Sequence, residues 1–516
     1  MNPIELSLFS ARINAICDEM GAVLRRTAFS PNIKDRLDFS CAIFDRQGQL
    51  CAQAAHIPVH LGSMAFAMES IISTVEWNEG DMLILNDPFK GGTHLPDITV
   101  IAPVFTNKQL CGFVTNRAHH ADAGCDTPGS MPLSTNINEE GLIIPPTKIV
   151  RQGELIETTV LSLLEKSRDP TAERGDFIAQ ISANTSGLKR LRQLIEKLGV
   201  ITWELALVAL NNYAEKLSLS RLEQLPEGSF NFTDYMDDDG QGQYKIPITV
   251  NLTCSGHDKE LVITVDFAGT ADQVHGNINC PLSVTAAAVY YVFYCLMPKN
   301  TPACAGCFRP IRLIVPAKSL LNAAYPAAVV AGNVETSTRI VDVMLGALAQ
   351  AIPDQIPAAS HGSMNNIAMG AQNWAYYETL GGGMGANPRS QGLDAVQTHM
   401  TNTLNTPIEV LEMTYPLRIS RYAIRQGSAG NGSNAGGEGL IRTYHFLEAA
   451  TVSLLTERRL RSTWGLQGAC SGLIGENRLN KKTLPAKVEL DVKLGDEISI
   501  STPGGGGWGK ISNEAV

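Results

Sequence analysis

The sequence predicts an α+β fold: a mixed α/β, multi-layer arrangement of mixed sheets with buried helices and a β-rich C-terminal region. Some long segments repeat their apolar residues every three to four positions, as amphipathic helices do, while others alternate apolar and polar residues, as half-buried strands do. One apolar stretch, PLSVTAAAVYYVFYCLM, carries no charge, which is typical of a helix buried on all sides. Beyond about residue 405, short strand-like segments are separated by glycine-containing loops.

The N-terminal segments are expected to alternate between helices and hairpins. In the first of them, Phe9, Ile13, Ile16, Met20 and Val23 share one helical face. The predicted elements are a helix over 3–27, a hairpin over 38–54, a helix over 61–75, a strand over 81–89 and a hairpin formed by 98–105 and 110–118. The polar residues before and after this last hairpin therefore lie at strand ends, where sites are commonly built.

The rest of the chain divides into a helical stretch, a central region and a terminal run of strands. The pattern predicts a helix over about 170–216, an antiparallel meander over 230–270, and buried helices over 281–297 and 336–352. Short strands are expected over 405–424, 439–448, 450–456 and 487–503. We expect three domains: 1–225, an N-terminal α/β domain that carries the site motifs, 226–404, a central α+β domain, and 405–516, a β-rich region.

Composition limits the class of protein. The chain of 516 residues has a net charge of −10 and no basic run, which does not suit the phosphates of nucleic acids or an anionic lipid surface. No stretch approaches the roughly 18 apolar residues of a membrane helix. The first twenty residues carry acids and an arginine where a signal peptide needs an apolar middle. We therefore expect a cytoplasmic protein.

The eleven cysteines are scattered through apolar segments and are expected to be reduced core thiols. Cys304 and Cys307 form one CxxC, a spacing that redox pairs and half zinc sites use. No second CxxC and no nearby histidine accompany it, so the pattern favours a structural role.

Two glycine-rich stretches resemble parts of nucleotide-binding loops, and a third is a candidate functional loop. In GGGGWGKI, Ile511 stands where a phosphate loop needs Ser or Thr, and too few residues follow for a helix. GSAGNGSNAGG precedes a strand-like run instead of a helix, so it lacks the context of a dinucleotide site. GGGMGANPR is either a ligand-contacting loop or a site of close loop packing. The sequence thus predicts no nucleotide site in this chain.

A short region concentrates three of the ten histidines, with aspartates interleaved. His94 and Asp97 flank Pro96, which disfavours a continuing helix, and an extended or turning segment can aim both side chains at one point. Further carboxylates at nearby segment ends are Asp35, Asp38 and Asp87. Carboxylates and imidazoles at one point suit a divalent ion such as zinc, manganese or iron.

His119 and His120 follow the second strand of the hairpin and point to opposite sides of it, so one of them can reach the same point. The other, together with Asp122, is then free to support a ligand or to transfer protons. An alternative is that these side chains only cap loops or fill hydrogen-bonded positions in a core. No GxSxG motif accompanies them, so a serine nucleophile has no support.

Several long, ordered blocks resemble the hydantoinase B family, the B-type subunits and domains of hydantoinases and 5-oxoprolinases. The resemblance extends from about residue 3 to 510. The blocks are NDPFKGGTHLPDITVIAPVF, NRAHHADAG, NINCPLSVTAAAVYY, GNVETSTR, THMTNTLNTPIEVLEMTYPLR and TPGGGGWG.

This resemblance implies a division of labour between two subunits. A hydantoinase A-type partner would bind ATP and phosphorylate the carbonyl oxygen of a small cyclic amide, and this chain would supply a metal-activated water that opens the ring. The implied metal ligands are Asp38, His94, Asp97 and His119. His120 and Asp122 become acid/base candidates. Cys125 departs from the paired glycines often found at this point of the family.

Two rival functions remain open from the sequence. Related proteins carboxylate ketones with a similar centre, and a third small subunit encoded nearby would favour that reaction. A non-catalytic scaffold for the A-type partner is the other rival. It predicts no bound metal and an unchanged partner activity when Asp97 or His119 is replaced by alanine.

Overall fold

The computed structural model describes residues 1–55, 57–60, 62–256 and 261–511, and it confirms the predicted α+β class. Residue 61, where a predicted helix begins, and residues 257–260, within the predicted meander, lie outside these ranges. The α-helices span Pro3–Thr27 (α1), Pro31–Lys34 (α2), Ser63–Ile71 (α3), Glu157–Leu164 (α4), Pro170–Leu198 (α5), Val200–Leu222 (α6), Leu282–Leu296 (α7), Ser337–Ala351 (α8) and Ile408–Thr414 (α9). Among the described residues, no helix is both long enough and apolar enough to cross a bilayer.

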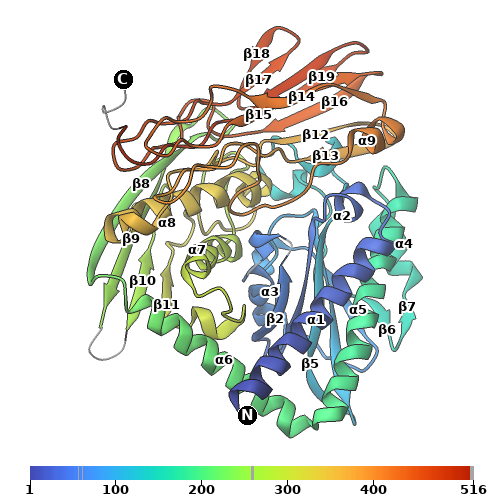
Figure 1. Cartoon of the computed structure of the whole chain (residues 1–516). Coiled ribbons are helices and arrows are strands. Elements are labelled where there is room, and N and C mark those ends of the chain that lie inside the picture. The colour runs from blue at the N-terminus through green and yellow to red at the C-terminus, as the bar shows by residue number, and fades with distance from the viewer. Residues whose placement is uncertain (56, 61, 257–260, 512–516) are drawn as a thin grey trace.

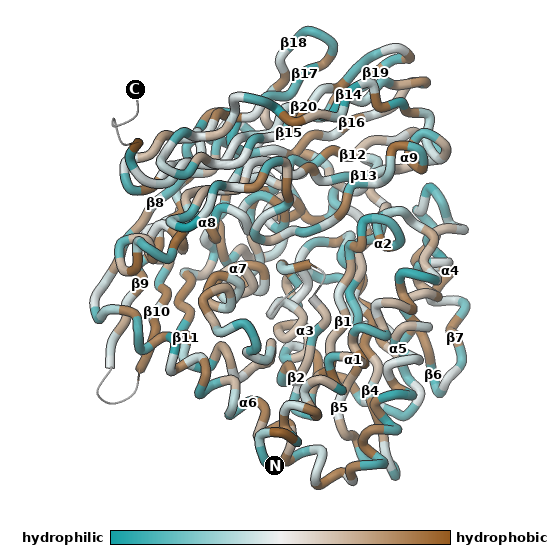
Figure 2. Tube along the Cα trace, in the orientation of Figure 1, coloured by the Kyte–Doolittle hydropathy of each residue, from teal (hydrophilic) through white to brown (hydrophobic). Residues whose placement is uncertain are grey.

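An antiparallel sheet of seven strands forms the N-terminal layer, in the order β2-β1-β5-β4-β3-β6-β7. Its strands are β1 (Phe39–Phe44), β2 (Leu50–Ala55), β3 (Met82–Leu85), β4 (Asp97–Thr106), β5 (Gln109–His119), β6 (Thr147–Arg151) and β7 (Glu154–Leu155). Both predicted hairpins are present. Helices α1 and α5 lie side by side over one face, and apolar stretches gather along β4 and β5 (Figures 1 and 2).

Alternate residues of this sheet enter two different cores. Val100 of β4 packs in the core that contains α1 and α5, while its neighbour Ile101 packs with Met64 and Met68 of α3. Successive side chains of a strand point to opposite faces, so neighbours in sequence meet different helices. The same alternation continues to the strand ends.

A second, four-stranded sheet, β11-β10-β9-β8, forms the central layer. Strands β8 (Gly228–Asp238), β9 (Tyr244–Ser255) and β10 (Val262–Asp266) form the predicted antiparallel meander, and β11 (Ile311–Ile314) joins β10 in parallel. Helices α7 and α8 lie between the two layers (Figure 1). The predicted buried helix α8 is fully buried from Ser337 to Leu348 and is preceded by a π-helical turn, Gly332–Thr336.

The C-terminal part forms two further sheets, β13-β12-β16-β19 and β14-β15-β20-β17-β18. These strands, drawn in orange and red, lie across one end of the other layers (Figure 1). Strands β12 and β13 precede residue 405 and still belong here. The bounds are β12 (Asn366–Ala371), β13 (Trp374–Glu378), β14 (Leu417–Arg425), β15 (Gly439–Phe446), β16 (Ala450–Leu455), β17 (Glu476–Leu479), β18 (Lys482–Leu484), β19 (Lys487–Val492) and β20 (Glu497–Ser501).

Three predicted elements differ from the structure. The helix over 170–216 is two helices, because Gly199 between α5 and α6 adopts φ +80°, a conformation that ends a helix. The first part of 405–424 forms the helix α9 instead of a strand, and it buries Leu411. Helix α7 is fully buried only over its first half, because its C-terminal turns reach the surface, where Cys295 is exposed.

The glycine-rich stretches pack closely against backbone. A Cβ at Gly505 or Gly506 would stand 2.1 Å from the carbonyl oxygens of Met384 and Trp464, respectively, so no larger residue fits. Cys304 and Cys307 are buried, and the Cys307 thiol donates to the Pro302 carbonyl oxygen at 2.9 Å, as expected for reduced core thiols.

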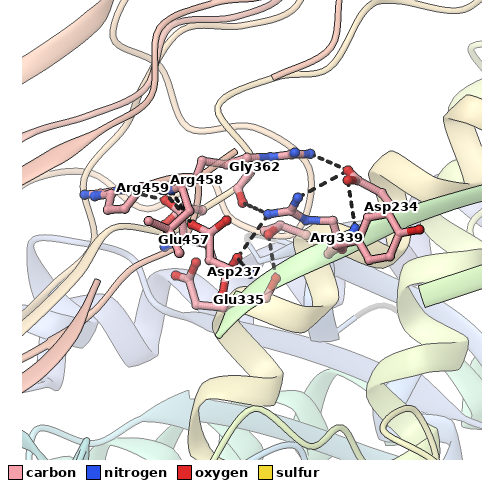
Figure 3. A network of polar contacts seen from close by, with 12 residues as sticks. Asp234, Asp237, Glu335, Arg339, Gly362, Glu457, Arg458 and Arg459 are labelled. Carbon is pink, nitrogen blue, oxygen red and sulfur yellow. Dashed lines mark hydrogen bonds and ion pairs between the residues drawn. The ribbon is translucent and has the colours of Figure 1, made fainter. Parts of the chain in front are cut away.

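A buried network of charges joins the central layer to the C-terminal layer (Figure 3). Arg339 of α8 lies 3.2 Å from Asp234 of β8 and 3.3 Å from Glu457. Arg458 pairs at 2.7 Å with both Asp234 and Asp342. Removing one partner of a buried ion pair leaves a buried charge without compensation, which is strongly destabilising.

We expect the variant Arg458→Met to lower the free energy of unfolding by about 3–5 kcal/mol, because two buried carboxylates lose their shared cation. The matched control is Arg190→Met, which removes a 2.9 Å ion pair with Glu19 on the exposed surface. That pair is worth about 0–1 kcal/mol. Urea denaturation midpoints measure both effects, and equal midpoints for the two variants would contradict the importance of the network.

Glu335 generates a pH-dependent prediction. Burial, followed by the charge of Glu457, raises its pKa from 4.5 to about 8. Between these values the folded protein holds a proton that the unfolded chain has lost, so this group makes stability fall as pH rises through that window. Glu335→Gln should therefore become more stable relative to the wild type between about pH 5 and about pH 9. Thermal midpoints at both pH values test this, with exposed Glu409→Gln as the control.

Candidate metal centre

Three acidic and imidazole residues stand in a row at one edge of the N-terminal sheet. Asp97 is the first residue of β4, His119 is the last residue of β5, and the two are directly paired across the strands. Asp38 comes immediately before β1, and its carbonyl oxygen accepts the His119 backbone N–H at 3.0 Å. The sheet thus brings together residues that are up to 81 positions apart in the sequence.

His94 completes a triangle of possible ligand atoms with Asp97 and His119. His94 Nε2 lies 3.2 Å from His119 Nδ1 and 3.3 Å from Asp97 Oδ1, and His119 Nδ1 lies 3.2 Å from Asp97 Oδ1. An ion with bonds of about 2.0–2.2 Å to nitrogen and oxygen holds neighbouring ligands about 3.0–3.5 Å apart. The triangle therefore fits a divalent ion.

Neighbouring groups orient these side chains. His94 Nδ1 lies 3.3 Å from the Val330 carbonyl oxygen, which accepts its N–H and leaves Nε2 for the centre. Thr93 Oγ1 donates to Asp97 Oδ2 at 2.5 Å. Partners of this kind fix the tautomer and direction of metal ligands. Farther out, Glu140 Oε1 accepts the backbone N–H of Val330 at 3.0 Å, which holds the segment that supports His94.

A small cavity of about 20 Å³ adjoins the triangle. Its volume suits about one water molecule or an ion. Asp38 lines this cavity too, but it is not part of the close triangle. The other polar groups around it are His60, Asn333, Tyr377, Thr379 and Thr401, and the apolar ones are Ile57, Val59, Val334, Met364 and Met400.

Burial and mutual charge set the ionisation of the triangle. Burial lowers the pKa of His119. For His94, burial alone would lower the pKa, but the charge and hydrogen bond of Asp97, the Val330 carbonyl and the charge of Asp38 together outweigh it, so the pKa is raised. Burial also works to raise the pKa of Asp97, but the charge of His94 and hydrogen bonds from its neighbours hold that pKa well below its usual range. The centre therefore keeps an ionised carboxylate away from solvent.

His119 and His120 point to opposite faces of the sheet, as expected for an extended strand. His119 stacks on Tyr377 with ring centroids 4.6 Å apart, on the side of the small cavity. The His120 ring packs on Phe177 of α5, and its Nε2 lies 3.0 Å from Gln180 Oε1. Alternation along the strand separates the two neighbouring imidazoles.

The structure places the two acid/base candidates away from the triangle. His120 and Asp122 line another cavity, of about 230 Å³, on the α5 side of the sheet. Asp122 pairs with Arg168 at 3.1 Å. Neither residue lines the small cavity. Their role in proton transfer stays a prediction.

Two polar residues at the small cavity were missed from the sequence. His60 Nε2 lies 3.5 Å from Asp97 Oδ2, and Asn333 Nδ2 lies 3.4 Å from the same oxygen. His60 lies in HIPVHLGSM, which holds a second histidine but no carboxylate at a ligand spacing. Asn333 lies in the block GNVETSTR, whose π-helical turn is a feature frequent at functional sites, but that turn becomes visible only in the fold.

Comparison with known proteins identifies relatives along the whole chain. A 5-oxoprolinase of Arabidopsis thaliana is 40% identical over 98% of this chain, which spans only 42% of that enzyme. An uncharacterised protein of Methanocaldococcus jannaschii is 41% identical, with 99% of this chain and 91% of that protein covered. The crystal structure of an ATP-dependent caprolactamase from Pseudomonas jessenii superposes with a TM-score of 0.91 at 25% identity, covering 99% of this chain and 91% of that one.

The family model described as hydantoinase B/oxoprolinase matches residues 2–511. This match includes every residue of the triangle and all four sheets. On this evidence, the chain belongs to the hydantoinase B/oxoprolinase family.

Proposed function

We propose that this chain is the B-type subunit of an ATP-dependent cyclic-amide hydrolase of the hydantoinase/5-oxoprolinase kind. The observation that carries the proposal is the triangle of His94 Nε2, Asp97 Oδ1 and His119 Nδ1, with sides of 3.2–3.3 Å. Membership of the hydantoinase B/oxoprolinase family and the likeness to a caprolactamase support a cyclic amide as substrate.

In this proposal His94, Asp97 and His119 would hold a divalent ion, zinc, manganese or iron, with Asp38 in the wall of the same cavity as a further ligand. When bound, the ion would lower the pKa of a water toward neutrality. His60 and Asn333 also line this cavity and would offer hydrogen bonds there. The surrounding apolar side chains exclude bulk solvent, which strengthens each electrostatic contact.

The net reaction consumes the ring, ATP and two waters: the oxygen of one water joins the carbonyl carbon, the ring C–N bond breaks, the nitrogen gains a proton, and the second water releases the phosphoryl group as phosphate. A lactam thus gives a carboxylate and an amine, and a hydantoin gives a carboxylate and a ureido group. A resonance-stabilised amide is a poor electrophile, so phosphorylation of its oxygen is needed first. We assign that step to a hydantoinase A-type partner that uses ATP, because the glycine loops here pack against backbone. The ATP dependence of the caprolactamase supports the same assignment.

The metal centre can be tested on the isolated chain. Protein purified without chelator, or reconstituted, should contain about one equivalent of zinc, manganese or iron by elemental analysis. Asp97→Ala and His119→Ala should lose it, because each removes one corner of the triangle. His120→Ala is the matched control and should keep it, because its ring faces α5. Equal metal content in all variants, or none in any, would refute the centre.

The activity is tested with an A-type partner, ATP and a panel of 5-oxoproline, hydantoin and caprolactam. Formation of the ring-opened carboxylate should require both subunits and should fall about 100-fold or more in Asp97→Ala. Cleavage of ATP should continue in that variant, because the partner performs it. Product formed from a ketone and bicarbonate instead would favour the carboxylase, and an unchanged rate in Asp97→Ala would favour the scaffold.

A further inference from the structure

The larger cavity on the α5 side of the sheet has the features of a binding site. Its volume of about 230 Å³ suits a small organic molecule. Four distant segments meet around it: the residues before α2, the end of β5, the first turns of α5 and the turn between β12 and β13, with the end of α9 beside them. Figure 1 shows α2, α9, β13 and α5 at the same corner of the molecule.

The walls of this cavity are mainly negative. Asp122 is paired with Arg168, whose guanidinium also donates to the carbonyl oxygen of Cys125 at 2.8 Å. Arg168 is the one Lys or Arg among the described residues that line the cavity. Three further carboxyl groups remain there, those of Asp169, Glu173 and Asp176.

The ionisation of Glu173 reflects this excess of acids. Burial is the largest cause that raises its pKa to about 8, and the charges of Asp122, Asp176 and Asp169 contribute in the same direction. A positive charge that entered the cavity would therefore be stabilised by several carboxylates at once.

Some buried polar atoms in the wall of this cavity have no hydrogen-bond partner among the described residues. His120 is 1% exposed, and within the described structure its Nδ1 has no hydrogen-bond partner, while Gln180 holds the opposite edge of the ring. Ser30 is 5% exposed, and its Oγ is likewise without a partner among the described residues. Buried polar atoms are normally satisfied, so each such atom points to a ligand or a bound water.

Aromatic rings complete the wall. Trp374 and Tyr415 lie with ring centroids 5.6 Å apart, and Trp374 Nε1 donates to Glu448 Oε1 at 2.7 Å, which holds the indole in place. Carboxylates beside aromatic rings are the surroundings that organic ammonium groups prefer, through charge attraction and cation–π contact. A bare metal ion is less suited, because no close group of three possible ligands exists here among the described residues.

We propose that this cavity binds the ammonium group of a small organic amine. The carboxylates of Asp169 and Asp176 attract the charge, Ser30 and His120 offer hydrogen bonds, and the aromatic rings cover the aliphatic part. The ligand class follows from the cavity alone. That the amine is the product of ring opening rests on the proposed function.

The test measures binding of butylammonium chloride to the purified full chain by isothermal titration calorimetry. Butanol and sodium butyrate are the neutral and anionic probes of similar size. Butylammonium should bind with a stoichiometry of about one and the other two should not, because only the ammonium has the charge that the acids attract. Binding of butanol as tight as that of butylammonium would overturn the proposal.

Two isosteric variants locate the site. Asp176→Asn keeps an oxygen that can accept the Phe29 and Ser30 backbone N–H groups, and Asp169→Asn keeps a residue suited to the N-cap of α5. Each should weaken butylammonium binding roughly tenfold. Exposed Asp354→Asn is the control and should leave it unchanged. If one variant fails to fold, the other still gives the answer. Unchanged binding in every cavity variant that folds would refute the site.

This measurement is independent of catalysis. It needs no partner subunit, no ATP and no turnover, so loss of the amine site and loss of the ring-opening activity are separate outcomes. Amine binding in the absence of any ring-opening activity would leave the site in place and remove only its link to the product.

Discussion

The pairing register between β4 and β5 is the constraint on which the candidate metal centre depends. Asp97 stands directly opposite His119, and the β5–β1 pairing brings the backbone of Asp38 to the other side of His119. A slip of one residue would turn every side chain of β5 to the other face. His120 would then face the triangle and His119 would face α5. The buried apolar residues on both faces prevent this slip, since it would exchange the two cores.

The outer layers decide which groups surround the triangle. The π-helical turn before α8 presents Asn333 and Val334, the segment before that turn supplies the carbonyl oxygen of Val330, and β13 contributes Tyr377. The buried charges of Arg339 and Arg458 join α8 and β8 to the C-terminal layer (Figure 3). Stability of the layers and geometry of the centre are therefore connected, because a shift of the C-terminal layer would move Tyr377 from His119.

One strand end separates two chemical environments. On the α3 side, a cavity of about 20 Å³ holds the triangle and admits about one water molecule or ion. On the α5 side, a cavity of about 230 Å³ is lined by acids and aromatic rings. His119 faces the small cavity and His120 faces the larger one, because successive side chains of an extended strand point to opposite faces of the sheet. The small cavity suits a step that uses water, and the larger one suits binding of an organic cation.

Local pattern determined much of this protein from the sequence alone. Helix α1, both N-terminal hairpins, the meander and the buried helix α8 follow from periodicity and turn residues, and the resemblance of ordered blocks named the family and the residues His94, Asp97 and His119. Tertiary structure decided the contacts between distant segments, which periodicity does not predict. It broke the predicted long helix at Gly199, turned His120 and Asp122 toward α5, and brought His60 and Asn333 to Asp97 from segments 37 and 236 residues away. The physical reason is that these contacts join distant segments, and only the packing of layers fixes which distant side chains meet.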